Sequence, residues 1–181
     1  MRALAAATAL SLLGACGGDP SKGDAASATE AMGVARVTPK NGSTVRGIIS
    51  FTQKGDRVAV AGQFFELLPG PHSLYIHAVG NCGSPNAASA GPVWNVAGGP
   101  SGKRSGDLPQ IYAGTEGRAD LSISVRDLSV GTGQPNDVIG RSVVVHADVD
   151  PDPKAEFGVR NGWLACGVIQ RSDAKTLREL L

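Results

Sequence analysis

Hydrophobic residues recur at every second position in short runs that begin near residue 34 and are separated by turn-forming residues. In residues 57–67, for example, Val58, Val60 and Phe64 fall on one face. A period of two is strand geometry, because successive side chains of a strand point to opposite faces. Several short strands at this spacing predict an all-β antiparallel sandwich or barrel. The predicted strands are 34–37, 45–53, 57–67, 72–79, 111–113, 118–125, 140–147 and 164–169.

The run at residues 72–79 brings two candidate functional side chains to one face. A tight turn, Pro69-Gly70-Pro71, precedes it and excludes a continuing helix. Alternate hydrophobic residues of the run share one face, whereas Tyr75 and His77 share the other. Because they project side by side, Tyr75 and His77 can converge on one small site.

Loop content and composition agree with this architecture. Residues 80–110 show little periodicity, and a loop of that length inside a compact domain is usually functional. The 25 Gly, 11 Pro and few aromatic residues suit many turns better than a helical bundle. With 17 Lys+Arg against 16 Asp+Glu, the charge gives no case for nucleic acid as a partner.

The N-terminal segment predicts export and a membrane anchor. Residues 1–16 carry one Arg and then a short run rich in Ala and Leu, which fits a secretory signal peptide. Residues 13–16, Leu-Gly-Ala-Cys, resemble the bacterial lipobox, which implies cleavage before Cys16 and lipidation of that residue. An incidental Cys16 after an ordinary signal peptide is the alternative. Residues 17–33 lack bulky hydrophobic residues and are expected to form a flexible tether.

An anchor of this kind places the protein in a bacterial cell envelope, facing the periplasm or the cell surface, because multiple acyl chains hold a protein stably at a membrane. The membrane is therefore the expected partner. The sequence leaves open whether that membrane is the inner or the outer one, and whether the chain is a homodimer.

Residues 68–82 read LPGPHSLYIHAVGNC and resemble the copper-ligand strand of the Cu/Zn superoxide dismutases, whose pattern is L-x-P-G-x-H-G-F-H-I-H-x-x-G-D-C. Other segments are similar to that family in the same order, namely GSTVRGIISFTQ, SAG with WN, GDLP, GRSVVVHA and LACGVI. The resemblance covers residues 34–170 and implies a Greek-key β-barrel or sandwich of about eight antiparallel strands. Residues 171–181 are expected to form a short amphipathic helix or a frayed tail.

The resemblance implies four copper-binding histidines, and two of those positions hold histidine here, His77 and His146. Tyr75 stands at the first position and Val93 at the position that bridges copper and zinc. Imidazole suits both copper oxidation states. A valine cannot bind metal, and a neutral phenol binds Cu(II) poorly.

The zinc side loses more ligands. Residues 96–103 contain no histidine, Arg104 stands at the third zinc position, and Asp107 alone remains. One carboxylate beside an arginine is not a zinc site, because structural zinc takes four N, S or O ligands. A guanidinium pairs well with a carboxylate, so we expect Arg104 to replace zinc as the partner of Asp107. Two exposed, unrelated charges are the alternative.

Other positions follow from the same resemblance. The resemblance implies a disulfide between Cys82 and Cys166, and two free buried thiols are the alternative. Trp163 replaces the arginine that guides superoxide. Within residues 148–162, Asp150 matches the aspartate that orients ligands from behind, and we expect it to accept a hydrogen bond from Tyr75 instead. A separate histidine, His72, matches a structural position inside the sheet.

Three functions remain in competition. The first is a dismutase-like lipoprotein whose activity is lost. The second is a binding module, which holds Cu(I) through His77 and His146 with Tyr75 nearby, or haem, with Trp163 and Val93 as an apolar wall. The third is a residually active copper-only dismutase.

Overall fold

The computed structural model describes residues 30–147 and 162–180. The predicted signal peptide, the lipidation site Cys16 and the candidate residue Asp150 lie outside this range, and so does most of the predicted tether. Within the described residues, no helix is both long and apolar enough to cross a membrane.

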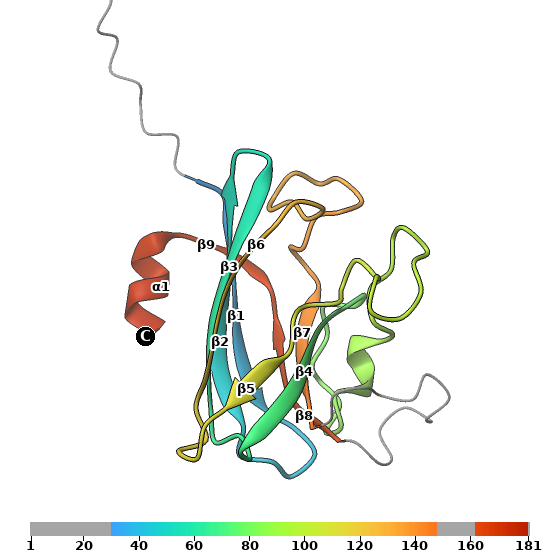
Figure 1. The fold of residues 1–181 in the computed structure, drawn as a ribbon. Helices are drawn as coiled ribbons and strands as arrows, with labels where there is room; N and C mark the ends of the chain where they lie inside the picture. The colour runs from blue at the N-terminus through green and yellow to red at the C-terminus, as the bar shows by residue number, and fades with distance from the viewer. Residues whose placement is uncertain (1–29, 148–161, 181) are drawn as a thin grey trace, which may run out of the picture.

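The described chain is an all-β barrel, as the sequence predicts (Figure 1). Eight strands form one antiparallel array in the order β5-β4-β7-β8-β1-β2-β3-β6, and β9 pairs with β1. In this array β3, β5 and β6 are each followed in the sequence by a strand that is not their neighbour in the sheet, which is Greek-key connectivity. The strands are β1 Met32–Pro39, β2 Arg46–Lys54, β3 Arg57–Phe65, β4 Gly70–His77, β5 Ile111–Ala113, β6 Ala119–Val125, β7 Ser142–His146, β8 Trp163–Val168 and β9 Gln170–Ser172.

The core lies where the period-two pattern places it. In β3 the hydrophobic residues Val58, Val60 and Phe64 are buried, whereas Ala59, Ala61 and Gln63 are more exposed. In β4, Leu74 and Ile76 face the same core. The opposite face of β4 is therefore free to carry polar chemistry, provided that another part of the chain covers it.

The ends of the domain differ from the sequence-based boundaries. β1 begins at Met32, because Met32 and Gly33 pair with β2 on one side and β9 on the other, so these two residues belong to the barrel and not to the expected tether. β9 was not expected, since its three residues carry no clear pattern. The expected short helix is α1, Ala174–Leu180, and Asp173 accepts a hydrogen bond from the Thr176 backbone N–H at its start.

The loop of residues 80–110 covers the outer face of β4 and β7, and it includes the short 3-10 helix Ala88–Ala90. The Cys82–Cys166 disulfide ties it to β8 across a sequence separation of 84 residues. This bridge confirms the expected pairing. In the chain-entropy model such a closure stabilises a fold by about 4 kcal/mol.

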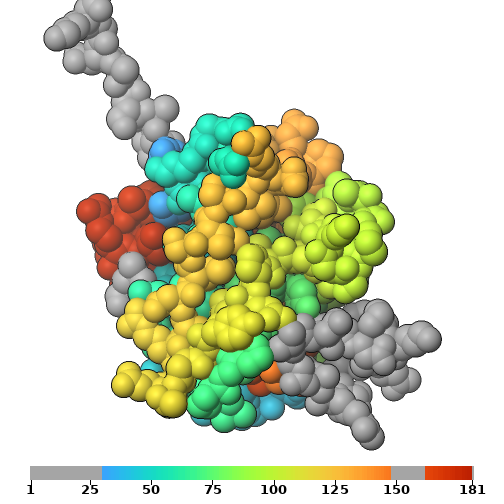
Figure 2. All heavy atoms as spheres, viewed as in Figure 1, coloured from blue at the N-terminus to red at the C-terminus, as the bar shows by residue number. Residues whose placement is uncertain are grey.

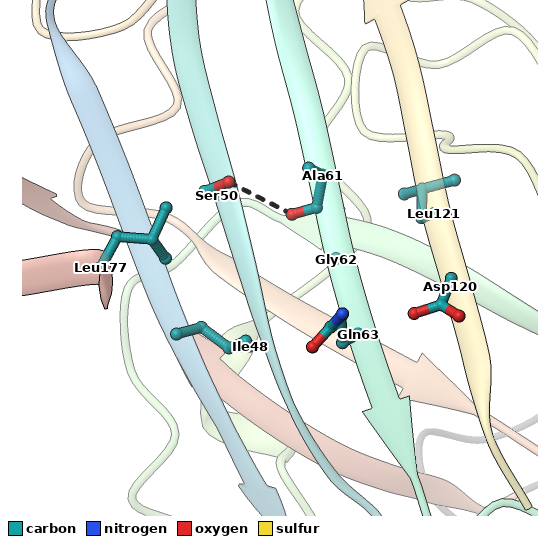
Figure 3. A pocket seen from close by; sticks show the side chains of 8 residues that line it. All are labelled: Ile48, Ser50, Ala61, Gly62, Gln63, Asp120, Leu121 and Leu177. Atoms are coloured by element: carbon teal, nitrogen blue, oxygen red, sulfur yellow. Dashed lines mark hydrogen bonds between the residues drawn. The ribbon is translucent and has the colours of Figure 1, made fainter. Parts of the chain in front are cut away.

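The opposite side of the molecule carries α1, as Figure 2 shows. There a pocket of about 260 Å³ opens on the outer face of β2, β3 and β6 (Figure 3). Leu177 of α1 lies at one edge of it, and inside it the Ser50 hydroxyl donates to the Ala61 carbonyl. None of the sequence-predicted site residues lines this pocket.

Candidate functional site

Backbone hydrogen bonds hold the loop of residues 80–110 against β4, next to the candidate site. The Ile76 N–H donates to the Gly106 carbonyl at 2.8 Å, and the Trp94 N–H donates to the Ile76 carbonyl at 2.9 Å. The contact is so close that a Cβ at Gly106 would lie 2.1 Å from the Ile76 carbonyl oxygen. Only glycine permits this approach, and as a result the loop pairs along the edge of β4, where Asp107 and Val93 form β-bridges with Tyr75 and His77.

His77 and His146 meet beneath this loop. Their side chains are almost fully buried, with residues 1% and 2% exposed, and their Nε2 atoms lie 3.4 Å apart. The Nδ1–H of His77 donates to the Gly91 carbonyl at 2.7 Å, so its Nε2 carries a lone pair. The Nδ1 of His146 has no hydrogen-bond partner among the described residues. The Nε2 atoms of the two rings therefore face each other in a space that is shielded from bulk solvent.

Burial keeps both imidazoles neutral. Desolvation lowers the pKa of His77 to about 4, against a smaller opposing effect of its hydrogen bond to Gly91. Desolvation, followed by the charges of His77 and Arg104, lowers the pKa of His146 to about 3. Since metals bind the neutral imidazole, both rings are in the binding form at neutral pH.

Two larger aromatic rings enclose the pair. The Tyr75 ring meets the His146 ring edge-on, with centroids 4.8 Å apart. The Trp163 ring lies 4.8 Å from the His77 ring and 5.4 Å from the His146 ring. We call Tyr75, His77, His146 and Trp163 the aromatic cluster. It joins β4, β7 and β8. Three predicted site residues therefore converge with Trp163, which stands where the family resemblance implies a guiding arginine.

The pairing expected between Arg104 and Asp107 is present. Arg104 Nε and Nη2 donate to Asp107 Oδ1 at 3.0 and 2.8 Å, and the Arg104 backbone N–H donates to Oδ2. Both side chains are mostly buried, at 19% and 10% exposure. The guanidinium carbon lies 5.3 Å from the centroid of Tyr75, so a fixed positive charge stands beside the aromatic cluster.

The donor atoms do not fit zinc. Val93, which forms a β-bridge with His77, offers no donor, and the carboxylate of Asp107 is already bound by a guanidinium. The described residues contain no group of three or more His, Cys, Asp or Glu side chains that could hold a metal. The two facing Nε2 atoms do fit a soft cation of low coordination number, for which two neutral imidazoles are suitable ligands.

Several contacts were outside the reach of the sequence. The Gly91 carbonyl that orients His77 is a backbone atom, which residue type does not reveal. Arg141 stacks 3.7 Å from the Trp94 ring centroid and donates to the Asp137 carbonyl, which helps hold the loop. The ring nitrogens of His72 lie 2.8 and 3.3 Å from backbone carbonyl oxygens, as expected for a structural histidine.

Comparisons with known proteins point in one direction. Residues 45–169 match the family model described as copper/zinc superoxide dismutase. The chain is 37% identical over 145 residues to a Cu-Zn superoxide dismutase of Onchocerca volvulus, covering 71% of this chain and 90% of that protein. It is 35% identical over 150 residues to Cu-Zn superoxide dismutase 2 of Brassica juncea, covering 76% and 95%.

A solved structure gives the same fold. The clock protein EA4 superposes with a TM-score of 0.64 at 26% identity, covering 78% of this chain and 95% of that chain.

The lowered histidine pKa values predict acid sensitivity of the metal-free protein. Below about pH 6.5 the unfolded chain protonates both histidines, whereas the folded chain keeps them neutral until about pH 4 and pH 3. The free energy of unfolding should therefore fall on acidification, by roughly 1 kcal/mol per pH unit for each imidazole. Urea denaturation between pH 7 and pH 4 should show a shallower dependence in His77→Gln/His146→Gln. Parallel curves for the variant and the wild type would contradict this account.

The buried ion pair predicts a loop that is stable without metal. Arg104→Gln leaves Asp107 buried without its guanidinium and should cost about 1–3 kcal/mol of stability. Arg104→Gln/Asp107→Asn should recover part of that loss. The matched control is Arg118→Gln, which removes the exposed pair with Asp120 and should show no measurable loss of stability.

EDTA should leave the melting temperature unchanged, and a large drop would reveal a structural metal.

Proposed function

Because the chain belongs to the copper/zinc superoxide dismutase family yet offers two imidazoles at its centre, we propose that it holds Cu(I) between His77 and His146 and has no dismutase activity. The observation that carries this proposal is the pair of buried, neutral imidazoles with Nε2 atoms 3.4 Å apart. A two-coordinate site of nitrogen donors suits Cu(I), whereas Cu(II) prefers four or more N and O ligands in a tetragonal arrangement.

The local charge also favours the lower oxidation state. Arg104 acts on both imidazoles electrostatically, and its effect is to lower the pKa of each ring. The same charge opposes any bound cation, and it opposes a divalent cation twice as strongly as a monovalent one. Asp107 offsets part of this repulsion, because it is held by Arg104 on the same side of the site.

Catalysis makes a demand that this site does not meet. Superoxide dismutation requires a metal that alternates between two oxidation states at a place that a small anion can reach. Here the residues that carry both imidazoles are at most 2% exposed, and Trp163 stands where the family resemblance places a guiding arginine. An apolar ring at that point removes the electrostatic steering that speeds encounters with anions.

The same geometry gives haem less support than Cu(I). A porphyrin needs an open, flat cleft over its axial ligand, whereas the two imidazole nitrogens face each other. A pocket of about 490 Å³ lies beside the site and is lined by Tyr75, Ser73 and Asp107, but not by His77 or His146. Haem bound there would meet a phenol and a carboxylate that is already paired with Arg104.

We also propose that the protein is a lipoprotein of a bacterial cell envelope, anchored through Cys16. The support is the lipobox-like sequence at residues 13–16 and the polar segment that follows it. The Cys82–Cys166 disulfide agrees with an oxidising compartment, because such bridges are rare in the cytosol.

Copper titration and a dismutase assay test the central proposal. Anaerobic competition with a Cu(I) chelator should show one Cu(I) per chain, and His77→Gln or His146→Gln should weaken binding at least about tenfold. His72→Gln removes the other histidine of the chain and should keep Cu(I) binding.

Copper-loaded wild type should not dismute superoxide. Tyr75→His/Val93→His should recover Cu(II) binding before it recovers rate, because Trp163 remains. Dismutation near the diffusion limit by the wild type would refute the proposal.

The anchor has its own test. In a bacterial host that lipidates exported proteins, wild type should appear in the membrane fraction, and Cys16→Ser should be released or remain unprocessed. Unchanged fractionation and migration of Cys16→Ser would overturn the lipoprotein proposal without touching the copper site.

A further inference from the structure

Trp163 has a particular position in the aromatic cluster. It is the first residue of β8 and lies opposite His146, at an irregularity between β7 and β8 that re-aims the side chains there. Its residue is 7% exposed, and its ring packs against both imidazoles. Tyr75, by contrast, makes its ring contact with His146. Trp163 is thus the ring that the two histidines share.

A cation between His77 and His146 would be held by two neutral rings, beside the positive charge of Arg104. Both imidazoles are neutral, and no described carboxylate is hydrogen-bonded to either ring, since their ring nitrogens contact Gly91 and each other. Asp107 is engaged by Arg104. A charge held in such a space, shielded from bulk solvent, needs a nearby source of negative potential.

The indole face is such a source. Aromatic rings carry negative potential on their faces, and tryptophan attracts cations more strongly than tyrosine or phenylalanine when the cation lies within about 6 Å of the ring centroid. The Trp163 ring lies 4.8 and 5.4 Å from the centroids of the two imidazole rings whose nitrogens would hold the metal. Its plane is inclined by 37° to that of His146 and by 72° to that of His77, with which it makes a T-shaped contact.

We propose that Trp163 is a third contact of the bound soft monovalent cation, made through its indole π face. This inference rests on the proposed Cu(I) site and extends its ligand set from two imidazoles to two imidazoles and an indole. The contact adds attraction without adding a donor atom, and it fills space that water would need to complete a Cu(II) coordination sphere. The replacement of a guiding cation by tryptophan then changes the preferred oxidation state as well as the access of anions.

Spectroscopy separates this contact from simple packing. The chain has two tryptophans, so Trp94→Phe leaves Trp163 as the single indole reporter. Anaerobic addition of Cu(I), or of redox-inert Ag(I), should quench and shift its emission and produce a near-ultraviolet difference band at one equivalent. The matched control is Trp94→Phe/His146→Gln, in which the cation loses its position and the difference band should be absent.

Affinity gives the second readout. Trp163→Leu keeps an apolar side chain without a π face and should weaken Cu(I) binding about 10-fold, with Trp163→Phe between leucine and wild type. Melting curves of the metal-free variants check that the fold is kept. If Trp163→Leu does not fold, the spectral test in Trp94→Phe still decides, because it leaves Trp163 in place.

The outcomes are distinguishable. Cu(I) binding that depends on both histidines, with no difference band and equal affinity in Trp163→Leu, overturns the indole contact and leaves the proposed function standing. Absence of histidine-dependent Cu(I) binding in the wild type overturns the proposed function and this inference with it. A difference band together with the order tryptophan, phenylalanine, leucine supports both.

Discussion

The close backbone pairing of the 80–110 loop with β4 is the constraint on which the site depends. It needs Gly106, whose missing side chain lets the loop approach the Ile76 carbonyl, and the Cys82–Cys166 bridge holds the other part of the loop to β8. Because the loop lies so close, His77 and His146 lose contact with water. Their neutrality follows mainly from this burial, and the positive charge of Arg104 adds to it.

Arg104 holds the loop through its guanidinium, at a position where the family resemblance implies a zinc ligand. Asp107 is mostly buried and requires a cationic partner, and a guanidinium three residues earlier supplies it through its side chain and its backbone N–H. The partner is covalently part of the loop, so it does not depend on metal supply. It also brings a permanent charge beside Tyr75. Stability of the loop and repulsion of a divalent metal thus have one cause.

The sequence predicted the parts that depend on local pattern. The alternation in β3, and the two faces of β4 that separate Leu74 from Tyr75, follow from a period of two. The disulfide and the Arg104–Asp107 pair came through the family resemblance. The rest depends on long-range packing: the Gly91 carbonyl that sets the His77 tautomer, and the strand β9 that begins only because β1 offers it an edge. From the sequence, Trp163 could be interpreted only as the replacement of a charged residue. Its contact with both imidazoles depends on the packing of β8 beside β7 and β4, which the local sequence does not reveal.

Under the proposed function, the departures from the family's copper pattern in and around the aromatic cluster belong together. Tyr75 on β4, Val93 in the loop and Trp163 on β8 come from three parts of the chain, yet they act in one direction. The phenol and the valine remove donors that Cu(II) requires, and the indole adds an apolar face that Cu(I) tolerates and water does not. Under the proposed function, they surround two facing nitrogens beside the positive charge of Arg104, so that the lower charge and the lower coordination number are both preferred.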